Sequence, residues 1–186
     1  MGRPKIRSRK SSIAAAFVQA IIPRSVDIEA QAALYEKFGI DPELCVYCGA
    51  EKTDDDHLRP IVKQGKSSGY FHTVENLVPS CGRCNQSKSG RDWRSWMEGN
   101  AKHSPTRRKV PDTQERIARL SRFAVASETP VIHPSEMPAI VGPLWENYWL
   151  KLSDIERLME EAELDAKKIR GALEAEFNRR MGLSPL

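Results

Sequence analysis

The chain has 186 residues, of which 40% are hydrophobic and 29% charged, and its formal net charge at pH 7 is +4. This composition is typical of a globular protein, and apolar runs such as residues 13–17 fall far short of the roughly 20 residues of a membrane-spanning helix. We therefore expect no contact with membranes. Because the basic residues 1–10 precede a segment too polar for a signal peptide, we expect a cytoplasmic protein.

Positive charge is concentrated in two segments of the chain. Residues 1–24 carry six basic side chains and no acidic one, and residues 81–110 carry eight basic side chains against two acidic ones. Clustered positive charge favours a polyanionic partner, because binding to phosphates releases counterions. We expect the basic arm, up to about residue 22, to be disordered or to become ordered only on a partner.

A helix, two short strands and a loop are predicted between residues 26 and 80. Residues 26–38 are predicted to form a helix, with Ser25 as N-cap and Gly39 as its end, and with Tyr35 and Phe38 in the core. Residues 53–59 are predicted to form a strand that Pro60 ends. A loop over residues 62–73 and a second short strand over residues 77–80 follow.

Helices are predicted for most of the remaining chain. One begins near residue 82 and breaks around Gly90, and Asp92 caps another that carries Trp93 and Trp96. After a basic linker at residues 102–111, capping boxes at 112–115 and 153–156 predict helices to about residues 125 and 181. Between these helices, four prolines in residues 128–143 predict an extended connector.

The predicted last helix carries an apolar stripe with mostly 4-3-4-3 spacing. Such a stripe is typical of a helix that packs on its own domain, and it is also compatible with the seam of a homodimer. Its members are Ile155, Met159, Ala162, Ala166, Ile169, Leu173 and Phe177.

All four cysteines lie in two Cys-x-x-Cys pairs, Cys45 with Cys48 and Cys81 with Cys84. Each such turn lets two thiolates converge on one ion, and two turns complete a tetrahedral site. Since four thiolates leave no open position, we predict a structural Zn²⁺, with an iron–sulfur cluster as the alternative. The gap between the pairs is longer than the roughly 15–20 residues of a plain zinc ribbon, so the insert must be a small structure of its own.

Asp56 and His57 are neighbours on the predicted strand between the cysteine pairs. Their side chains leave a strand on opposite faces, so that one can bind a metal while the other faces a substrate. Asn85 follows Cys84 directly, and its amide oxygen is the candidate second ligand. A carboxylate, an amide oxygen and open water positions suit Mg²⁺, with Mn²⁺ as the alternative. His57 is then the candidate general base that activates water.

In these residues the sequence resembles the HNH endonuclease family, in its zinc-bound branch with a ββα-metal finger. The resemblance covers residues 45–97 and is carried by CVYCG, DDDHLRPI, TVENLVPSCGRCNQSKSGRDW and the following Trp96, in that order. It implies that His57 is the general base, that Asn76 braces the loop between the two strands, and that Asp56 and Asn85 bind the catalytic metal. Asn85 takes the place of the last His of the motif, which makes the chain an HNN variant.

The sequence departs from the family pattern between the two predicted strands. The usual Gly-Gly is replaced by residues 64–71, QGKSSGYF. This replacement leaves the shape of the loop open. It also leaves open whether His72 contacts the scissile phosphate or is an ordinary surface residue.

The resemblance implies hydrolysis of DNA, expected to be double-stranded, to 5′-phosphate and 3′-hydroxyl ends with one divalent cation. Trp93 and Trp96 are expected to pack the finger, and its minor-groove contacts carry little sequence information. The expected role is restriction, with a homing-type or phage-associated nicking nuclease, a non-catalytic zinc-finger nucleic-acid-binding module, or a zinc-stapled interaction protein as alternatives. The residues expected to contact phosphates are Arg83, Lys88, Arg91 and Arg94.

The predicted fold class is α+β. A small ββα-metal finger, stapled by the four-cysteine zinc site, is flanked by N-terminal and C-terminal α-helices. The predicted organisation is a basic arm at residues 1–24, an N-terminal helix at 25–44, the catalytic core at 45–99, and a helical region at 100–186 for packing, specificity or dimerisation.

Overall fold

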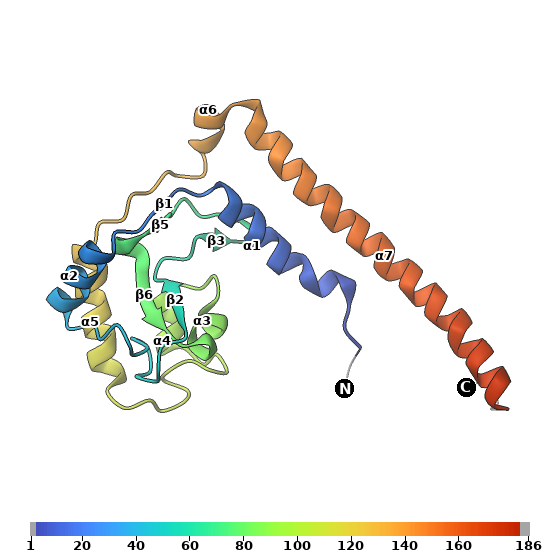
Figure 1. Cartoon of the computed structure of the whole chain (residues 1–186), viewed down its shortest axis with the longest axis horizontal. Helices are drawn as coiled ribbons and strands as arrows, with labels where there is room; N and C mark the ends of the chain where they lie inside the picture. Colours follow the sequence, from blue (N-terminus) through green and yellow to red (C-terminus); the bar gives the residue numbers. More distant parts are fainter. Residues whose placement is uncertain (1–2, 183–186) are drawn as a thin grey trace. The chain divides into compact units, whose positions relative to one another are not determined.

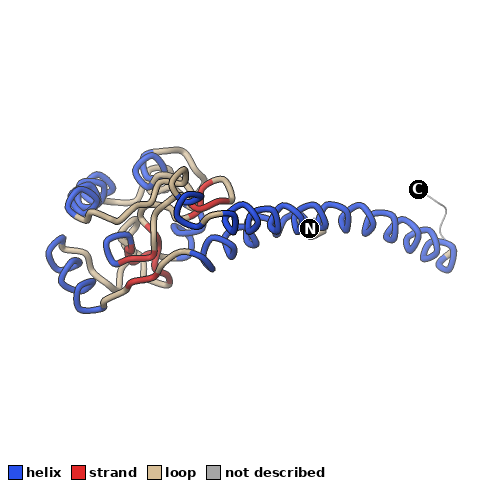
Figure 2. Tube along the Cα trace, turned by 90° about the horizontal axis from the view of Figure 1, so that it is seen from above, coloured by secondary structure: helices blue, strands red, loops and turns tan. Residues whose placement is uncertain are grey.

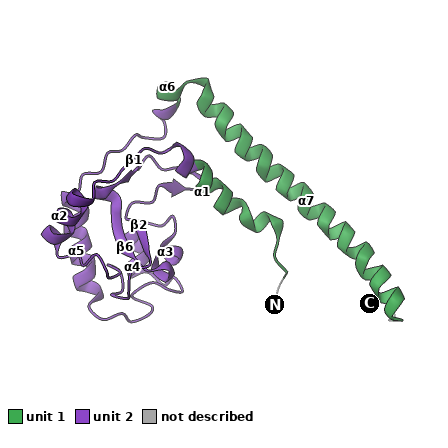
Figure 3. Ribbon diagram, viewed as in Figure 1, with its two compact units in different colours: residues 1–17, 138–186 green, residues 18–137 purple. Residues whose placement is uncertain are grey.

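The structure is a computed structural model that describes residues 3–182. It divides into two compact units, one of residues 18–137 and the other of residues 3–17 with 138–182 (Figure 3). Helices combine with three short two-stranded sheets in the described part of the chain, so the predicted α+β class is confirmed (Figure 1). Among residues 3–182, no helix has both the length and the apolar character that crossing a bilayer requires.

The centre of the unit of residues 18–137 is a ββα arrangement. β2 (Asp54–His57) pairs antiparallel with β6 (Leu77–Ser80), and α3 (Gly82–Lys88) follows directly. Asp56 lies opposite Val78, and His57 opposite Leu77. Because successive side chains of a strand alternate between its faces, Asp56 is buried while its neighbour Asp55 is exposed.

Three short strands form between β2 and β6 in the sequence, where a loop was predicted. β3 (Val62–Lys63) and β4 (Lys66–Ser67) make a hairpin whose two turn residues, Gln64 and Gly65, have φ of 53° and 75°. Positive φ at both central residues is the geometry that matches the twist of a two-residue hairpin. β5 (His72–Thr73) instead pairs in parallel with β1 (Arg24–Ser25), and η2 (Val74–Asn76) leads into β6. The strands are short segments among helices and loops (Figure 2).

Helices around the finger complete its core. α2 (Ile28–Phe38) is capped by Asp27 rather than by the predicted Ser25, and α4 (Trp93–Glu98) is capped by Asp92, as predicted. α5 (Thr113–Ala126) forms without the predicted capping box, since Asp112 has a φ of 56° and its side chain makes no capping hydrogen bond. The α5 residue Phe123 packs edge-on against Phe38, with ring centroids 5.6 Å apart.

The core of this unit is aromatic near the finger. Tyr47 and Trp96 are buried and meet edge-to-face at 5.2 Å, and Trp93 and Tyr35 are also buried. The prediction that both tryptophans pack the finger is therefore confirmed. The Trp96 indole also donates a hydrogen bond to the Ser87 hydroxyl at 3.0 Å, which ties α4 to α3.

The other unit is built on α7 (Pro143–Met181), with α6 (Met137–Val141) before it and η1 (Ile6–Arg9) and the start of α1 (Lys10–Ile21) beside it. The predicted disorder of the basic arm is wrong for residues 6–21. Lys10 pairs with Glu160 at 2.6 Å and Arg3 with Glu174 at 2.8 Å, so the acidic residues of α7 neutralise part of the arm.

α7 also starts earlier than predicted. Pro143 opens it, and proline suits the first turn of a helix because its missing N–H would have no partner there. The predicted capping box at Ser153 is therefore wrong, and residues 137–141 of the predicted extended connector are helical. Beyond residue 159 the described large apolar side chains of α7, Ile169 and Phe177 among them, are more than half exposed, whereas Met159 is partly buried.

Candidate active site

The two cysteine pairs meet at one point. The sulfur atoms of Cys45, Cys48, Cys81 and Cys84 all lie within 4.8 Å of one another, and those of Cys48 and Cys81 are 3.7 Å apart. Thiolates around a tetrahedral zinc ion at about 2.3 Å are separated by about 3.8 Å. The four cysteines therefore fit a structural zinc ion, as predicted, and they tie the start of the finger to its helix.

Backbone hydrogen bonds shape the first cysteine turn. The amides of Cys48 and Gly49 both donate to the Cys45 carbonyl, at 3.3 and 2.8 Å. Gly49 has a φ of 73°, a left-handed conformation that favours glycine. Arg108 donates to the Cys84 sulfur at 3.5 Å and places positive charge beside the thiolates.

A cavity of about 300 Å³ lies beside β2. Its walls bring together two histidines, two carboxylates, two amides and a guanidinium. The polar residues of this wall are Gln19, Arg24, Asp55, Asp56, His57, His72 and Asn85. Three predicted site residues, Asp56, His57 and Asn85, thus line one cavity.

Asp56 is the buried member of this set. Its carboxylate accepts a hydrogen bond from the Tyr47 hydroxyl at 2.8 Å and pairs with the Lys88 ammonium, whose Nζ lies 3.2 Å from Oδ1 and 3.1 Å from Oδ2. Burial raises the pKa of Asp56, while Lys88 and Tyr47 oppose that rise. Burial lowers the pKa of Lys88, and Asp56 opposes the fall.

Lys88 is not a phosphate contact. Its side chain is 0% exposed, and besides pairing with Asp56 its Nζ donates to the His57 carbonyl at 2.8 Å. The prediction that Lys88 holds DNA phosphates is therefore wrong. The signal that could have placed it correctly is its spacing: Lys88 follows the zinc-binding Cys84 by four residues, which puts both on the inner face of α3.

His57 meets a second histidine. Its Nε2 lies 3.0 Å from Nδ1 of His72, and Nε2 of His72 lies 3.4 Å from a guanidinium nitrogen of Arg24. Burial, with the charges of His72, Lys88 and Arg24 as smaller causes, lowers the pKa of His57 to about 4. Burial and Arg24 also lower the pKa of His72, against the carboxylate of Asp55. Both rings are thus neutral at neutral pH.

Asn76 connects the two segments that carry these histidines. Its side chain is 0% exposed, its Oδ1 accepts from the Arg59 amide at 2.8 Å, and its Nδ2 donates to the carbonyls of Arg59 and Phe71 at 2.9 and 3.1 Å. Arg59 follows His57 by two residues, and Phe71 directly precedes His72. These bonds have the geometry that a brace of the loop between the strands requires.

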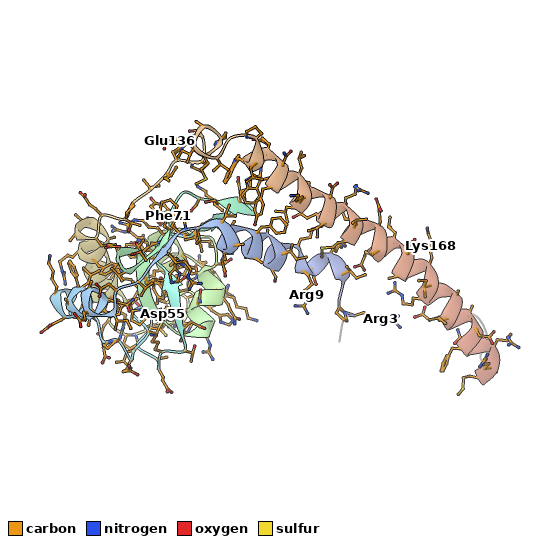
Figure 4. All side chains as sticks on the ribbon, turned by 45° about the horizontal axis from the view of Figure 1, so that its top comes forward. Arg3, Arg9, Asp55, Phe71, Glu136 and Lys168 are labelled. Carbon is orange, nitrogen blue, oxygen red and sulfur yellow. The ribbon has the colours of Figure 1, made fainter. Side chains whose placement is uncertain are left out.

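Three polar residues of the cavity, Gln19, Arg24 and Asp55, did not enter the predicted site, and the role of His72 was left open. Asp55, which Figure 4 labels, lies on β2. It is on the same strand face as His57, and its carboxylate pairs with Lys52 at 2.9 Å. The period of the strand could have indicated Asp55. Arg24 reaches the cavity through the pairing of β1 with β5, for which the sequence carries no local signal, and the same pairing places His72.

The other predicted phosphate contacts lie at the surface of α3, α4 and the turn between them. Arg83, Arg91 and Arg94 are exposed. Arg94 pairs with Glu98 at 3.1 Å one helical turn away, and the guanidinium of Arg91 donates to the Ser87 carbonyl. Their contact with DNA stays a prediction.

Part of the chain matches the model of a known protein family. Residues 45–91 match the model of the HNH endonuclease family. They are an HNH endonuclease domain. The matched segment contains all four cysteines, Asp56, His57, Asn76 and Asn85, and it excludes Arg24.

The HNH domain is also similar to part of a larger protein. The chain is 33% identical over 94 residues to the CRISPR-associated endonuclease Cas9 of Corynebacterium diphtheriae, an alignment that covers 44% of this chain and 8% of that protein. The chain therefore corresponds to a small part of that relative. No solved structure matches the chain significantly.

Proposed function

We propose that the protein is an endodeoxyribonuclease that cuts double-stranded DNA with one divalent cation and with His57 as general base. The observation that carries this proposal is the cavity beside β2, where His57 shares a wall with the oxygen donors Asp55, Asp56 and Asn85 inside an HNH domain. A base and a set of hard ligands at one opening are what hydrolysis of a phosphodiester requires.

The proposed role of His57 is to take a proton from the attacking water. The lowered pKa keeps its ring neutral at neutral pH, so that one nitrogen has a lone pair for this proton. The Lys88 ammonium holds the His57 backbone carbonyl, and Asn76 holds the segment two residues further on. These contacts fix the strand end from which the imidazole reaches the cavity.

The oxygen donors of the cavity fit a hard divalent cation such as Mg²⁺ or Mn²⁺, which prefers carboxylate and amide oxygens. Asp56 and Asn85 are the proposed ligands. Because Asp56 already balances Lys88, we add the exposed Asp55 as a further carboxylate candidate. When bound, such a cation stabilises the negative charge that develops on the phosphorus oxygens and on the leaving 3′ oxygen.

The proposed products are 5′-phosphate and 3′-hydroxyl ends, and the proposed role is restriction-type cleavage. Exposed arginines, Arg83, Arg91 and Arg94, would contact backbone phosphates. Since one HNH site cuts one strand, cutting both strands requires a second copy or a second event. The exposed apolar side chains of α7, Ile169 and Phe177 among them, support a homodimer as the second copy.

The test is cleavage of supercoiled plasmid by the full chain, with zinc bound and with Mg²⁺, Mn²⁺ or no added cation. Wild type is compared with Asn85→Ala and with the matched surface control Asn100→Ala. We expect metal-dependent cutting by wild type and control, and an increase of about tenfold in the Mg²⁺ concentration that Asn85→Ala needs. Ligation and phosphatase treatment of the products identify the ends.

The products separate the remaining possibilities. Discrete linear fragments support a sequence-specific restriction-type enzyme, and nicked circles alone support a nicking nuclease. DNA binding without cleavage under any cation would refute the proposed function and favour a zinc-finger binding module.

A further inference from the structure

Two residues beside His57 belong to a network that the general-base role does not explain. His72 lies on β5, and Arg24 lies on β1, outside the segment that matches the family. The parallel pairing of these strands sets Arg24 directly opposite His72, and the His72 amide donates to the Pro23 carbonyl at 3.3 Å. The N-terminal segment thus contributes a side chain to the cavity.

The side chains form a chain of close contacts. A guanidinium nitrogen of Arg24 lies 3.4 Å from Nε2 of His72, and Nδ1 of His72 lies 3.0 Å from Nε2 of His57. The two imidazole rings meet edge-to-face, with centroids 5.0 Å apart and an angle of 67° between their planes. Asn76 holds the residue before His72, because its Nδ2 donates to the Phe71 carbonyl at 3.1 Å.

Arg24 determines which atoms donate and which accept in these hydrogen bonds. A guanidinium donates hydrogen bonds and accepts none, so Nε2 of His72 must be the acceptor. A neutral imidazole has one proton, which in His72 is then on Nδ1, and this N–H donates to Nε2 of His57. His57 in turn has its proton on Nδ1. Its single lone pair, on Nε2, is occupied by His72.

We propose that Arg24 and His72 control the position of the proton on His57, and that a phosphate bound by Arg24 releases the lone pair that His57 needs as a base. The inference rests on the proposed function only for this catalytic consequence. His72 is then a positioning residue that acts through His57. Through Arg24, the tautomers of the His57 and His72 rings depend on whether an anion is bound.

The release follows from competition for Arg24. Its side chain is exposed and lines the cavity, and the charged oxygens of a phosphodiester are stronger partners for a guanidinium than a neutral imidazole nitrogen is. Once Arg24 turns to the phosphate, Nε2 of His72 no longer has to accept a hydrogen bond. His57 can then donate a hydrogen bond to His72 instead of accepting one.

The protons balance in this reversal. The Nδ1 proton of His72 moves to Nε2 of His57, His57 gives its Nδ1 proton to water, and water returns a proton to Nε2 of His72. Each ring ends neutral with one N–H. His57 now donates from Nε2 to His72 and has a free lone pair on Nδ1, the arrangement in which a base is oriented through its other nitrogen.

The test is long-range ¹H–¹⁵N NMR of the imidazole rings in the labelled full chain, with zinc bound and no other divalent cation, so that DNA is not cut. Without DNA we expect His57 protonated at Nδ1, and with a short duplex DNA we expect it protonated at Nε2. Arg24→Met should give the Nε2–H form of His57 without DNA. Arg122→Met, which removes an exposed guanidinium from α5, should behave as wild type.

A His57 tautomer that is unchanged by DNA, or unchanged by Arg24→Met, would overturn the proposal. Because these spectra need no cleavage, a protein in which His57 changes its tautomer but which never cuts DNA would refute the proposed function alone.

In an active enzyme we expect His72→Phe to lower kcat about tenfold with KM unchanged. His72→Asn, whose amide can donate or accept near the position of Nδ1, should restore most of the rate; equal loss in both variants would contradict the positioning role.

Discussion

Lys88 and Asp56 form a buried ion pair, with side chains 0% and 7% exposed and Nζ 3.1 Å from Oδ2. The pair joins the end of α3 to β2, and the same ammonium holds the His57 carbonyl. Removing one member of a buried pair leaves the other charge without a partner in a poorly hydrated site. The pair is therefore a structural support of the strand that carries His57.

We expect Lys88→Met to lower the free energy of unfolding by about 3–5 kcal/mol, because it leaves Asp56 buried and uncompensated. Chemical denaturation measures this loss, with the exposed Lys66→Met as the matched control. The salt dependence of DNA binding by the folded fraction should not change. A stable variant whose salt slope falls by about one would instead indicate that Lys88 contacts a phosphate.

The second prediction concerns the zinc ion. Purified protein should contain about one zinc per chain and be colourless, since an iron–sulfur cluster would absorb visible light. Cys48→Ser should lose the metal together with the structure of the finger, because binding to a structural site contributes directly to folding. Metal analysis and circular dichroism check both points. Retention of a folded finger without zinc would contradict this account.

The third prediction concerns Asn76. Asn76→Ala leaves the Arg59 amide and two carbonyls in the interior without their partner, and each unsatisfied group costs about 1–3 kcal/mol. We expect a marked loss of stability in thermal unfolding and a loss of cleavage in the fraction that stays folded. Asn100→Ala, at an exposed position, is the control. An active and fully stable Asn76→Ala would show that the brace is dispensable.

The pKa of His57 gives a prediction about pH. In the folded protein without added Mg²⁺ its ring should stay neutral until the pH falls to about 4, whereas an unfolded histidine titrates near 6.5. Between these values the unfolded state binds more protons, so His57 makes stability fall as the pH decreases. NMR titration gives the midpoint, and His57→Asn should flatten this part of the stability curve. A midpoint near 6.5 would refute the inferred burial effect.

The sequence predicted the features that depend on local spacing. The cysteine pairs fix the zinc site, the capping residue Asp92 fixes the start of α4, and the order of Asp56, Asn76 and Asn85 follows the family pattern. Each Cys-x-x-Cys turn and the Asp92 cap are local signals, and the family pattern supplies the order of the segments between them. The zinc-stapled ββα finger was predictable for this reason.

The features that the sequence did not predict depend on contacts between distant segments. The short pairing of β1 with β5 brings Arg24 to His72, 48 residues away in the sequence. No local sequence pattern predicts this pairing. The ion pairs of Lys10 and Arg3 with α7 cross more than a hundred residues and order an arm that its composition suggested was free. Lys88 was misplaced because a basic side chain on a short helix was read as solvent-facing.

Single-turnover cleavage of plasmid DNA by wild type and His57→Ala, at saturating Mg²⁺, tests whether His57 is the general base. Zinc content and DNA affinity are measured on both proteins to show that the finger is intact. If His57 is the base, the variant should bind DNA as wild type does and cut it at least about 10²-fold more slowly. Equal rates of metal-dependent cutting by the two proteins would show that the base lies elsewhere and would contradict the proposed mechanism.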